Sequence, residues 1–326
     1  MRWGLATLAL VVGLTLAAPA HAATQQVRKW KIHYRAHNGV AREAYVLLPA
    51  SYNRKTATPI PLVISPHGRG VSALANTRSW GGLPAQGQFA VVSPDGQGRK
   101  LGRYSWGSAG QIEDLARMPQ IVRLALPWVQ IDSHRIYAFG GSMGGQETLL
   151  LLARHPRLLA GAAVFDAVTD FAMQYRKWPS LACGKRCLKI WKVPLGRQLQ
   201  QLANEEVGAA PWVSPGAYDS RSPITYVRGI ARSCVPLQLW WSPRDKIVIN
   251  QTRQTGHFYD QLLAANPQAP VYGFVGFWKH SAEMRAMTRL PLALATFGLL
   301  AAEFESRGSP LAMKVPPSGW CQRPGG

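Results

Sequence analysis

Short apolar runs alternate with amphipathic segments along most of the chain. Residues 27–34 and 42–48 alternate apolar with polar positions on either side of Asn38-Gly39, which predicts a hairpin at the edge of a larger sheet. Continuous apolar runs at 61–65 and 89–93 predict strands buried on both faces. Further strands are predicted at 159–165, 236–241 and 271–275. Apolar residues at helical spacing predict helices over 111–129, 249–265 and 290–304.

This succession predicts an α/β protein with a mostly parallel, doubly wound sheet. In such sheets ligands bind at the carboxyl ends of the strands, so the loops that follow the strands are the first place to look for chemistry. The alternation of predicted strands and helices stops between about 169 and 213, which predicts a cap inserted over the strand ends. We expect residues 23–326 to form a single domain that carries this cap.

The N-terminus has the features of a secretory signal peptide. Arg2 precedes an apolar run from Leu5 to Ala18, and Ala20-His21-Ala22 supplies the small residues of a cleavage site. We expect residues 1–22 to be removed and the mature protein to be secreted or periplasmic. No other apolar stretch is long enough to cross a bilayer, so we expect no stable membrane span.

The amino-acid composition gives the chain a strong positive charge. The 326 residues are 47% hydrophobic, as in a globular protein, and carry a formal net charge of +21. Such a charge attracts anionic surfaces, including polysaccharides and lipid headgroups. The basic residues are scattered and form no nucleic-acid-binding motif, so we expect no nucleic-acid partner. A solvated basic surface is the simpler explanation.

Export permits disulfides between the four cysteines, Cys183, Cys187, Cys234 and Cys321. Four cysteines allow three pairings, of which we favour Cys183–Cys187 in the cap and Cys234–Cys321 as a long-range link. A zinc site is the alternative, but the spacing is poor for metal ligands and no histidine lies close by. We therefore expect no metal.

The segment from Arg135 to Leu152 carries the strongest chemical signal. After a predicted turn at 131–133, residues 135–139 predict a strand, a glycine-rich G-x-S-x-G turn follows, and residues 146–152 predict a helix. A serine at such a turn sits in strained backbone, which explains the glycines around Ser142. Its Oγ would project as a nucleophile, and the N–H of Met143 at the helix N-terminus would face a developing negative charge. A plain structural turn is the alternative.

A serine nucleophile needs an imidazole base, which in turn needs a carboxylate to orient it. Asp245 follows the predicted strand 236–241, and His280 follows the next strand, so both lie at the same sheet edge as Ser142. Asp166, which follows strand 159–165, is the fallback acid. A turn aspartate and a partly buried loop histidine are the alternative explanations.

A second oxyanion donor is predicted in the loop His67-Gly68-Arg69-Gly70, which follows an early buried strand. The glycines let the backbone approach a substrate, so the N–H of Arg69, or that of Gly70, would act together with that of Met143. A structural glycine turn is the alternative.

Six segments taken in order resemble the α/β-hydrolase superfamily, namely PHGRG, SPDGQG, GGSMGG, RSPITYV, WWSPRDKIV and WKHSAEM. The resemblance covers about residues 40–305 and is to a branch of secreted serine esterases that includes polyhydroxybutyrate-depolymerase-like, feruloyl-esterase-like and prolyl-oligopeptidase-type catalytic domains. It implies the α/β-hydrolase fold, and the superfamily order of nucleophile, acid and histidine matches Ser142, Asp245 and His280. Arg69 departs from the pattern, because a glycine or small residue is usual there.

These observations predict an exported carboxylic ester hydrolase that acts through an acyl-enzyme and needs no metal or organic cofactor. A short or aromatic acyl group is expected, on a substrate that is polymeric or anionic. The alternatives are a prolyl-oligopeptidase-type peptidase acting on short peptides and a non-catalytic binding protein of the same fold. Trp106, Trp241 and Trp278 are candidate substrate-binding residues, with core packing as their alternative role. The oligomeric state is left open.

Overall fold

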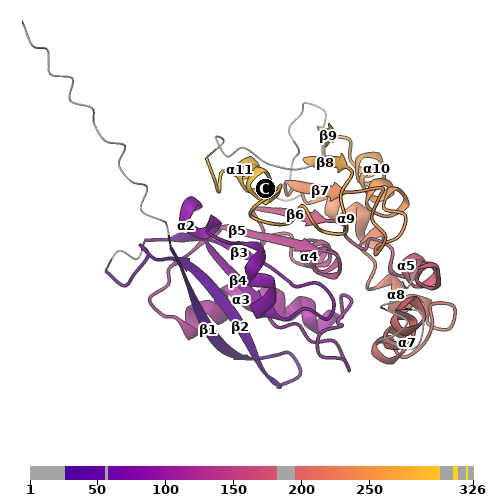
Figure 1. The fold of residues 1–326 in the computed structure, drawn as a ribbon, viewed down its shortest axis with the longest axis horizontal. Helices are drawn as coiled ribbons and strands as arrows, with labels where there is room; N and C mark the ends of the chain where they lie inside the picture. Colours follow the sequence, from indigo (N-terminus) through magenta and orange to yellow (C-terminus); the bar gives the residue numbers. More distant parts are fainter. Residues whose placement is uncertain (1–25, 56–57, 182–194, 302–310, 315–320, 322–326) are drawn as a thin grey trace, which may run out of the picture.

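The structure is a computed structural model that describes residues 26–55, 58–181, 195–301, 311–314 and 321. The expected signal peptide and the pair Cys183 and Cys187 lie outside these residues. The strands of the described residues form one nine-stranded sheet in the order β1-β2-β4-β3-β5-β6-β7-β8-β9 (Figure 1). Their bounds are β1 Val27–Arg35, β2 Ala41–Pro49, β3 Ile60–Ile64, β4 Ala90–Pro94, β5 Ile131–Gly141, β6 Gly161–Phe165, β7 Leu237–Trp241, β8 Val271–Gly276 and β9 Leu311–Lys314.

The sheet is mostly parallel, as predicted. Strands β4, β3, β5, β6, β7 and β8 pair in parallel. The β1–β2 hairpin is antiparallel and lies at one edge, while β9 is antiparallel at the other edge. Every residue of β3, β4, β6 and β7 is buried, which explains their mostly apolar sequences.

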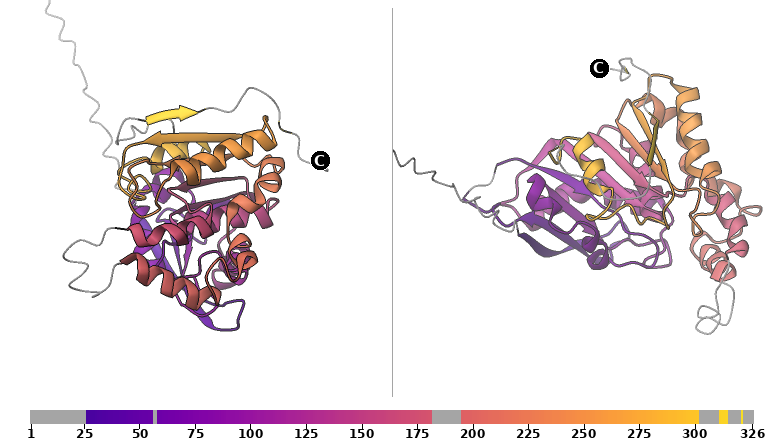
Figure 2. Two further views of the ribbon diagram at one scale, coloured as in Figure 1. Left: turned by 90° about the vertical axis from the view of Figure 1, so that its right-hand side faces the viewer. Right: turned by 45° about the horizontal axis from the view of Figure 1, so that its top comes forward.

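Helices cover both faces of the sheet (Figures 1 and 2). One apolar cluster joins the sheet to α3, α4, α9 and α10, and a second joins its other face to α2 and α11. The helix bounds are α1 Ala73–Asn76, α2 Leu83–Gly87, α3 Ala109–Ala125, α4 Met143–Arg154, α9 Val227–Arg232, α10 His257–Ala265 and α11 Leu290–Thr296. None of the helices within the described ranges is long and apolar enough to cross a membrane.

Three of the differences from the sequence prediction have a clear physical reason. Residues 131–133 begin β5 and do not form a separate turn, because Ile131 pairs with Ile60 across an irregularity in the ladder. The helix predicted over 290–304 ends at Thr296, shortly before Gly298, whose φ of +65° lies in the left-handed region that often terminates helices. Strand β9 was not predicted, since its four residues carry no alternating pattern.

Between β6 and β7 the chain forms a group of helices, α5 (Phe171–Lys177), α7 (Leu195–Val207) and α8 (Pro215–Asp219), which lies beside the sheet in Figure 1. Their core is aromatic: the rings of Phe171 and Tyr218 stack with centroids 4.9 Å apart. Trp106 stacks on Phe171 at 5.8 Å and links the group to the loop between β4 and α3. The expected cap, 169–213, falls largely within this group, and its bounds stay a prediction.

A buried carboxylate on α7 holds this helix against the loop that follows β4. Glu206 accepts hydrogen bonds from the backbone N–H groups of Lys100 and Leu101 at 2.8 and 3.0 Å, and Arg99 also donates its N–H to the same carboxylate. Arg221 forms an ion pair with Glu206 at 3.4 Å, and both side chains are buried. The charge of Glu206 is therefore compensated on every side, as a buried charge requires.

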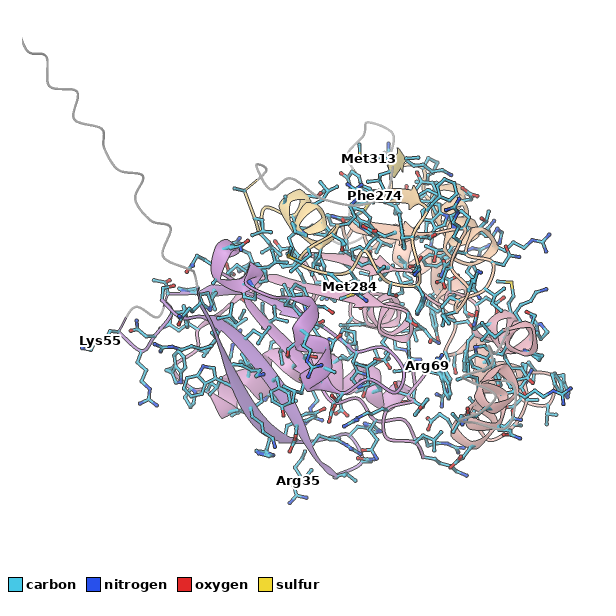
Figure 3. The ribbon with its side chains drawn as sticks, viewed as in Figure 1. Arg35, Lys55, Arg69, Phe274, Met284 and Met313 are labelled. Atoms are coloured by element: carbon cyan, nitrogen blue, oxygen red, sulfur yellow. A yellow bond between two sulfur atoms is a disulfide. The ribbon has the colours of Figure 1, made fainter. Side chains whose placement is uncertain are left out.

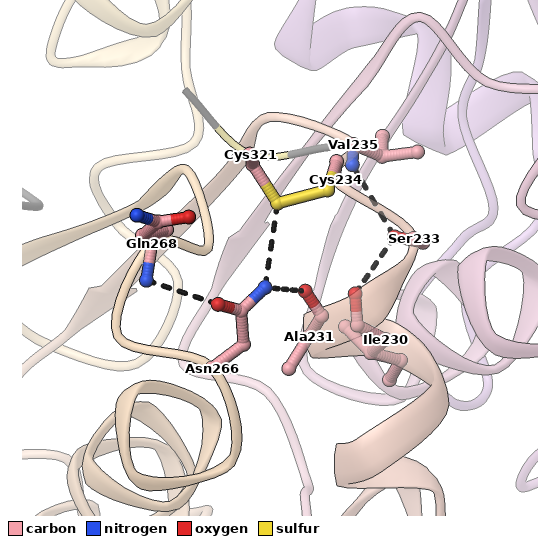
Figure 4. The surroundings of a disulfide bond; sticks show 8 residues. All are labelled: Ile230, Ala231, Ser233, Cys234, Val235, Asn266, Gln268 and Cys321. Carbon is pink, nitrogen blue, oxygen red and sulfur yellow. Dashed lines mark hydrogen bonds between the residues drawn. A yellow bond between two sulfur atoms is a disulfide. The ribbon is translucent and has the colours of Figure 1, made fainter. Parts of the chain in front are cut away.

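The predicted disulfide Cys234–Cys321 is present, and it spans a sequence separation of 87 residues (Figure 4). Asn266 donates to Cys321 Sγ at 3.3 Å and to the carbonyl of Ala231 at 3.0 Å, so the C-terminal segment is held against the end of α9. A bonded Cys234 and Cys321 leave no thiolate ligands for the alternative zinc site at these two positions.

Candidate active site

Ser142 stands at the turn between β5 and α4 with φ 58° and ψ −125°. This is strained backbone for a residue with a side chain. The turn depends on its glycines: a Cβ on Gly140 would collide with the carbonyl of Gly144, and a Cβ on Gly144 would collide with that of Pro66. The sequence G-x-S-x-G thus produces the tight strand-to-helix turn that it predicts.

The turn brings Ser142 to the wall of a pocket with a volume of about 370 Å³. Its side chain is largely buried, but it lines this space together with His280. The other residues used below that line the same pocket are Arg69, Ile247, Met284 and Arg285. Segments that follow β3, β5, β7 and β8 therefore meet at one edge of the sheet, as parallel strands require.

His280 and Asp245 form a hydrogen bond of 2.7 Å between Nδ1 and the carboxylate Oδ2. The second oxygen of Asp245 accepts from the N–H groups of Ile247 and Val248 at 2.7 and 3.2 Å. Asp245 accepts the hydrogen bond from Nδ1, so in the neutral imidazole Nε2 is the nitrogen that presents a lone pair. This is the tautomer that a general base acting on a serine hydroxyl needs.

The fallback acid, Asp166, has a different set of partners. Its Oδ1 accepts from the N–H of Ser242 at 2.9 Å, and its Oδ2 accepts from Trp278 Nε1 at 2.9 Å and from the N–H of Ser281 at 2.7 Å. Burial and the nearby charge of Asp245 raise the pKa of Asp166 to about 7. The acid that contacts the imidazole of His280 is Asp245, while Asp166 holds the two loops that carry Asp245 and His280.

Ser242 is a further link that sequence reasoning missed. Its Oγ donates to the carbonyl of Trp278 at 2.8 Å and accepts from the N–H of the same residue at 3.0 Å. The hydroxyl thereby joins the loop of Asp245 to the loop of His280. The available signal was a serine directly after a buried strand, which is too common to single out.

Ligand atoms of Asp166, Asp245 and His280 lie within 4.8 Å of one another, a spacing that would also suit a metal ion. The N–H groups described above already occupy all the carboxylate oxygens of Asp166 and Asp245. The donor set therefore fits a hydrogen-bonded relay better than a metal site.

Two backbone N–H groups near Ser142, those of the pocket-lining Arg69 and of the next residue Met143, have no acceptor among the described residues. Gly70, the alternative donor, gives its N–H to the carbonyl of Arg103 at 2.9 Å. Met143 is fixed at the start of α4 and receives a hydrogen bond at its sulfur from the N–H of Trp106. Two free N–H groups beside a serine are what an oxyanion site requires.

His67 fixes the orientation of the Arg69 N–H. Its Nε2 accepts from the N–H of Gly96 at 2.8 Å, so Nδ1 carries the proton and donates to the carbonyl of Gly68 at 2.8 Å. Burial lowers the pKa of His67, which keeps the ring neutral. The Gly68 carbonyl and the Arg69 N–H belong to one peptide plane, so holding the first sets the direction of the second.

A scan against protein-family models and a search of curated proteins found no match. Solved structures do match. An esterase from Rhizomucor miehei superposes with a TM-score of 0.62 at 12% identity, covering 84% of this chain and 82% of the other. An acylaminoacyl peptidase from Pyrococcus horikoshii superposes with a TM-score of 0.58 at 15% identity, covering 86% of this chain but 43% of the other. An esterase from Pyrococcus furiosus gives 0.54 at 16% identity, with coverages of 84% and 89%.

This chain has the α/β-hydrolase fold. At these identities the similarity concerns the fold, and the roles of individual residues must be argued from their own geometry. Within this α/β-hydrolase fold, the elements that carry Ser142, Asp245 and His280 are β5, β7 and β8 in chain order.

The three tryptophans expected to bind substrate do not line the Ser142 pocket. Trp106 is buried in the aromatic core of the inserted helices, Trp241 packs in the main core, and Trp278 packs on the opposite face of the sheet. Each is at most 5% exposed. Their large apolar surfaces are accounted for by packing, which was the alternative role, and the α/β-hydrolase pocket uses other residues.

Proposed function

We propose that this protein is a serine hydrolase that cleaves carboxylic esters through an acyl-enzyme. The observation that carries the proposal is the 2.7 Å hydrogen bond between Asp245 and His280, in a pocket that His280 shares with the strained Ser142. The N–H groups of Arg69 and Met143, which have no acceptor within the part of the chain that the structure describes, support it. The similarity in fold to esterases and to serine peptidases agrees with a hydrolase.

In the proposed mechanism, Nε2 of His280 accepts the proton of Ser142 as Oγ attacks the ester carbonyl carbon. The carbonyl electrons move to oxygen, and the N–H groups of Arg69 and Met143 stabilise the resulting oxyanion. Collapse of the tetrahedral intermediate expels the alcohol, which takes the proton from His280. Water then attacks the acyl-enzyme by the same route and restores Ser142.

The acyl group is proposed to be short or aromatic. A pocket of about 370 Å³ is near the lower limit for sites that hold drug-sized ligands, and two arginines line it, so a long lipid chain would fit it poorly. The protein is also proposed to be exported, since a long-range disulfide suits an oxidising compartment. The helices between β6 and β7 are proposed to act as a cap.

The test is a panel of p-nitrophenyl esters from acetyl to palmitoyl, together with feruloyl and acetylated sugars and peptide anilides. Wild-type protein is expected to cleave the short esters fastest, and Ser142→Ala to lose this activity. Faster cleavage of peptide anilides than of any ester would instead identify a peptidase. No turnover of any compound by folded wild-type protein would leave a non-catalytic binding role.

A further inference from the structure

Two guanidinium-bearing residues line the pocket of Ser142. Arg69 comes from the loop after β3, and Arg285 comes from the segment after β8. Arg69 is partly buried, while Arg285 is exposed. Among the residues that line this pocket none is an aspartate or a glutamate. The carboxylate of Asp245 lies behind the imidazole and is fully engaged with His280 and backbone N–H groups.

Neither Arg69 nor Arg285 has an ion pair or a side-chain hydrogen bond within the described residues. Other arginines do have carboxylate partners: the buried Arg221 pairs with Glu206 at 3.4 Å, and the exposed Arg103 and Arg117 pair with Asp95 at 3.7 Å and with Asp114 at 3.1 Å. The contrast is sharpest for Arg69, because a partly desolvated cation without a counter-charge is unfavourable.

Burial lowers the pKa of Arg69 from its ordinary value, although a guanidinium remains charged at neutral pH. The high net charge of the chain explains an exposed arginine such as Arg285 but not one that is partly buried in the catalytic pocket. Figure 3 labels Arg69 together with Met284, which lines the same pocket from the segment of Arg285. An anionic group bound between these segments would supply the missing counter-charge.

We infer that Arg69 and Arg285 form an anion-binding subsite and that the natural ester carries a carboxylate. This inference rests on the proposed ester hydrolysis. The backbone N–H of Arg69 faces the oxyanion while its side chain faces the carboxylate, so one residue couples recognition of the anion to the reacting carbonyl. A guanidinium suits this role because its planar fork of N–H groups matches a carboxylate.

The carboxylate could belong to the acyl part or to the alcohol part of the ester, and paired substrates distinguish these sources. Mono-p-nitrophenyl glutarate is compared with p-nitrophenyl pentanoate, and 4-acetoxybenzoate with phenyl acetate. Wild-type kcat/KM should favour the charged member of at least one pair. Raising the salt concentration should reduce that preference, because exposed charges are screened.

Arg69→Gln should lower kcat/KM for the preferred anionic ester by about tenfold more than for its neutral partner, since one partly buried charge is lost. Arg285→Gln should act in the same direction by about threefold, because solvent screens an exposed charge. Arg69→Lys keeps the charge and should retain most of the preference. Arg135→Gln is the matched control, because this exposed arginine lies in the first half of β5, away from the strand's carboxyl end.

Binding of glutarate to Ser142→Ala protein, measured by calorimetry, separates the subsite from the chemistry. Weaker binding when Arg69→Gln is added, but not when Arg135→Gln is added, would support the subsite even if no ester were cleaved. Ester hydrolysis accompanied by equal losses on charged and neutral substrates in Arg69→Gln, or by glutarate binding that ignores Arg69, would overturn the subsite while leaving the proposed function intact.

Discussion

The two walls of the pocket treat their polar groups in opposite ways. The acid–histidine wall consists of His280, which lines the pocket, and of Asp166, Ser242 and Asp245, which bond to its ring or its loop. Here every carboxylate oxygen accepts at least one hydrogen bond. The donor wall consists of Arg69 and Arg285, which line the pocket, and of Met143, which follows Ser142 in the chain. The N–H groups of Arg69 and Met143 and the guanidinium groups of Arg69 and Arg285 have no acceptor among the described residues.

This difference separates groups that hold a position from groups that await a ligand. Buried polar groups are normally satisfied, and a fully connected network fixes its members in one arrangement. Donors at a pocket wall that have no acceptor in the protein are free to bind a ligand, so they suit a substrate that supplies the acceptors. The acid–histidine wall would therefore prepare the base, and the donor wall would receive the ester and its charge.

The largest expected effect is the loss of the base. His280→Ala should lower kcat by about 10⁴-fold, because Ser142 would keep its hydroxyl proton. Circular dichroism should show an unchanged fold. His257→Ala, which alters an exposed histidine at the start of α10, should leave kcat within about twofold, as expected of a surface position remote from the pocket. Near-normal turnover in His280→Ala would contradict the role of His280 as the base on the acid–histidine wall.

Removing the disulfide tests whether a loss of global stability leaves the catalytic pocket intact. Replacing Cys234 and Cys321 together by serine should lower the free energy of unfolding by about 2–5 kcal/mol, since the bond closes a long loop. Urea unfolding measures this loss. Activity per folded molecule should not change, because neither cysteine lines the pocket. A loss of kcat at full folding would show that the C-terminal link also shapes the walls.

Asp166→Asn tests the satisfied network directly. The new amide would present N–H groups to the N–H donors of Ser242, Trp278 or Ser281, so the loops carrying Asp245 and His280 should shift. A displacement of this kind should lower kcat by about 10- to 100-fold, with a smaller change in KM. Asp260→Asn, on the exposed side of α10, is the matched control. Unchanged kcat in Asp166→Asn would show that Asp166 is not needed to hold the loops that carry Asp245 and His280.

The smallest effect concerns Glu147, which lies on α4 four residues after Met143 and accepts a hydrogen bond from Ser105. Burial raises the pKa of Glu147 from 4.5 to about 7. Between these values the folded state binds the proton more tightly than the unfolded state, so this group's contribution to stability falls as pH rises. It is fully present below about 4.5 and lost above about 7.

Glu147→Gln should therefore flatten the pH dependence of the free energy of unfolding. The variant should lose less stability than wild type between pH 5 and pH 8, by an amount on the order of 2 kcal/mol. Asp166 gives a contribution of the same sign but is present in both proteins, so the difference isolates Glu147. Parallel stability curves for the two proteins would contradict a raised pKa for Glu147.

Much of the fold could be predicted because its signals are local. Mostly apolar runs identify β3, β4, β6 and β7, since both faces of these strands are buried. The tight turn at Ser142 could be predicted from its glycines for the same reason. Strand β9 could not be predicted, because its short exposed sequence acquires order only by pairing with β8.

The candidate site was harder to predict where a residue's role depends on partners far away in sequence. Asp166 follows its strand just as Asp245 does, and only their hydrogen-bond partners distinguish the residue that contacts His280 from the residue that holds the loops. The burial of Trp106, Trp241 and Trp278 depends likewise on how the helices and strands pack. The choice between the N–H of Arg69 and that of Gly70 depended on the carbonyl of Arg103, which accepts the N–H of Gly70 and so leaves that of Arg69 as the donor.

The most direct test of the central claim is covalent labelling of the nucleophile. Wild-type protein, Ser142→Ala and His280→Ala would each be incubated with a fluorophosphonate, and the modified peptide identified by mass spectrometry. We expect one adduct, on the peptide that contains Ser142, which is absent in Ser142→Ala and forms far more slowly in His280→Ala. Labelling of a different serine, or of Ser142→Ala at the wild-type rate, would contradict it.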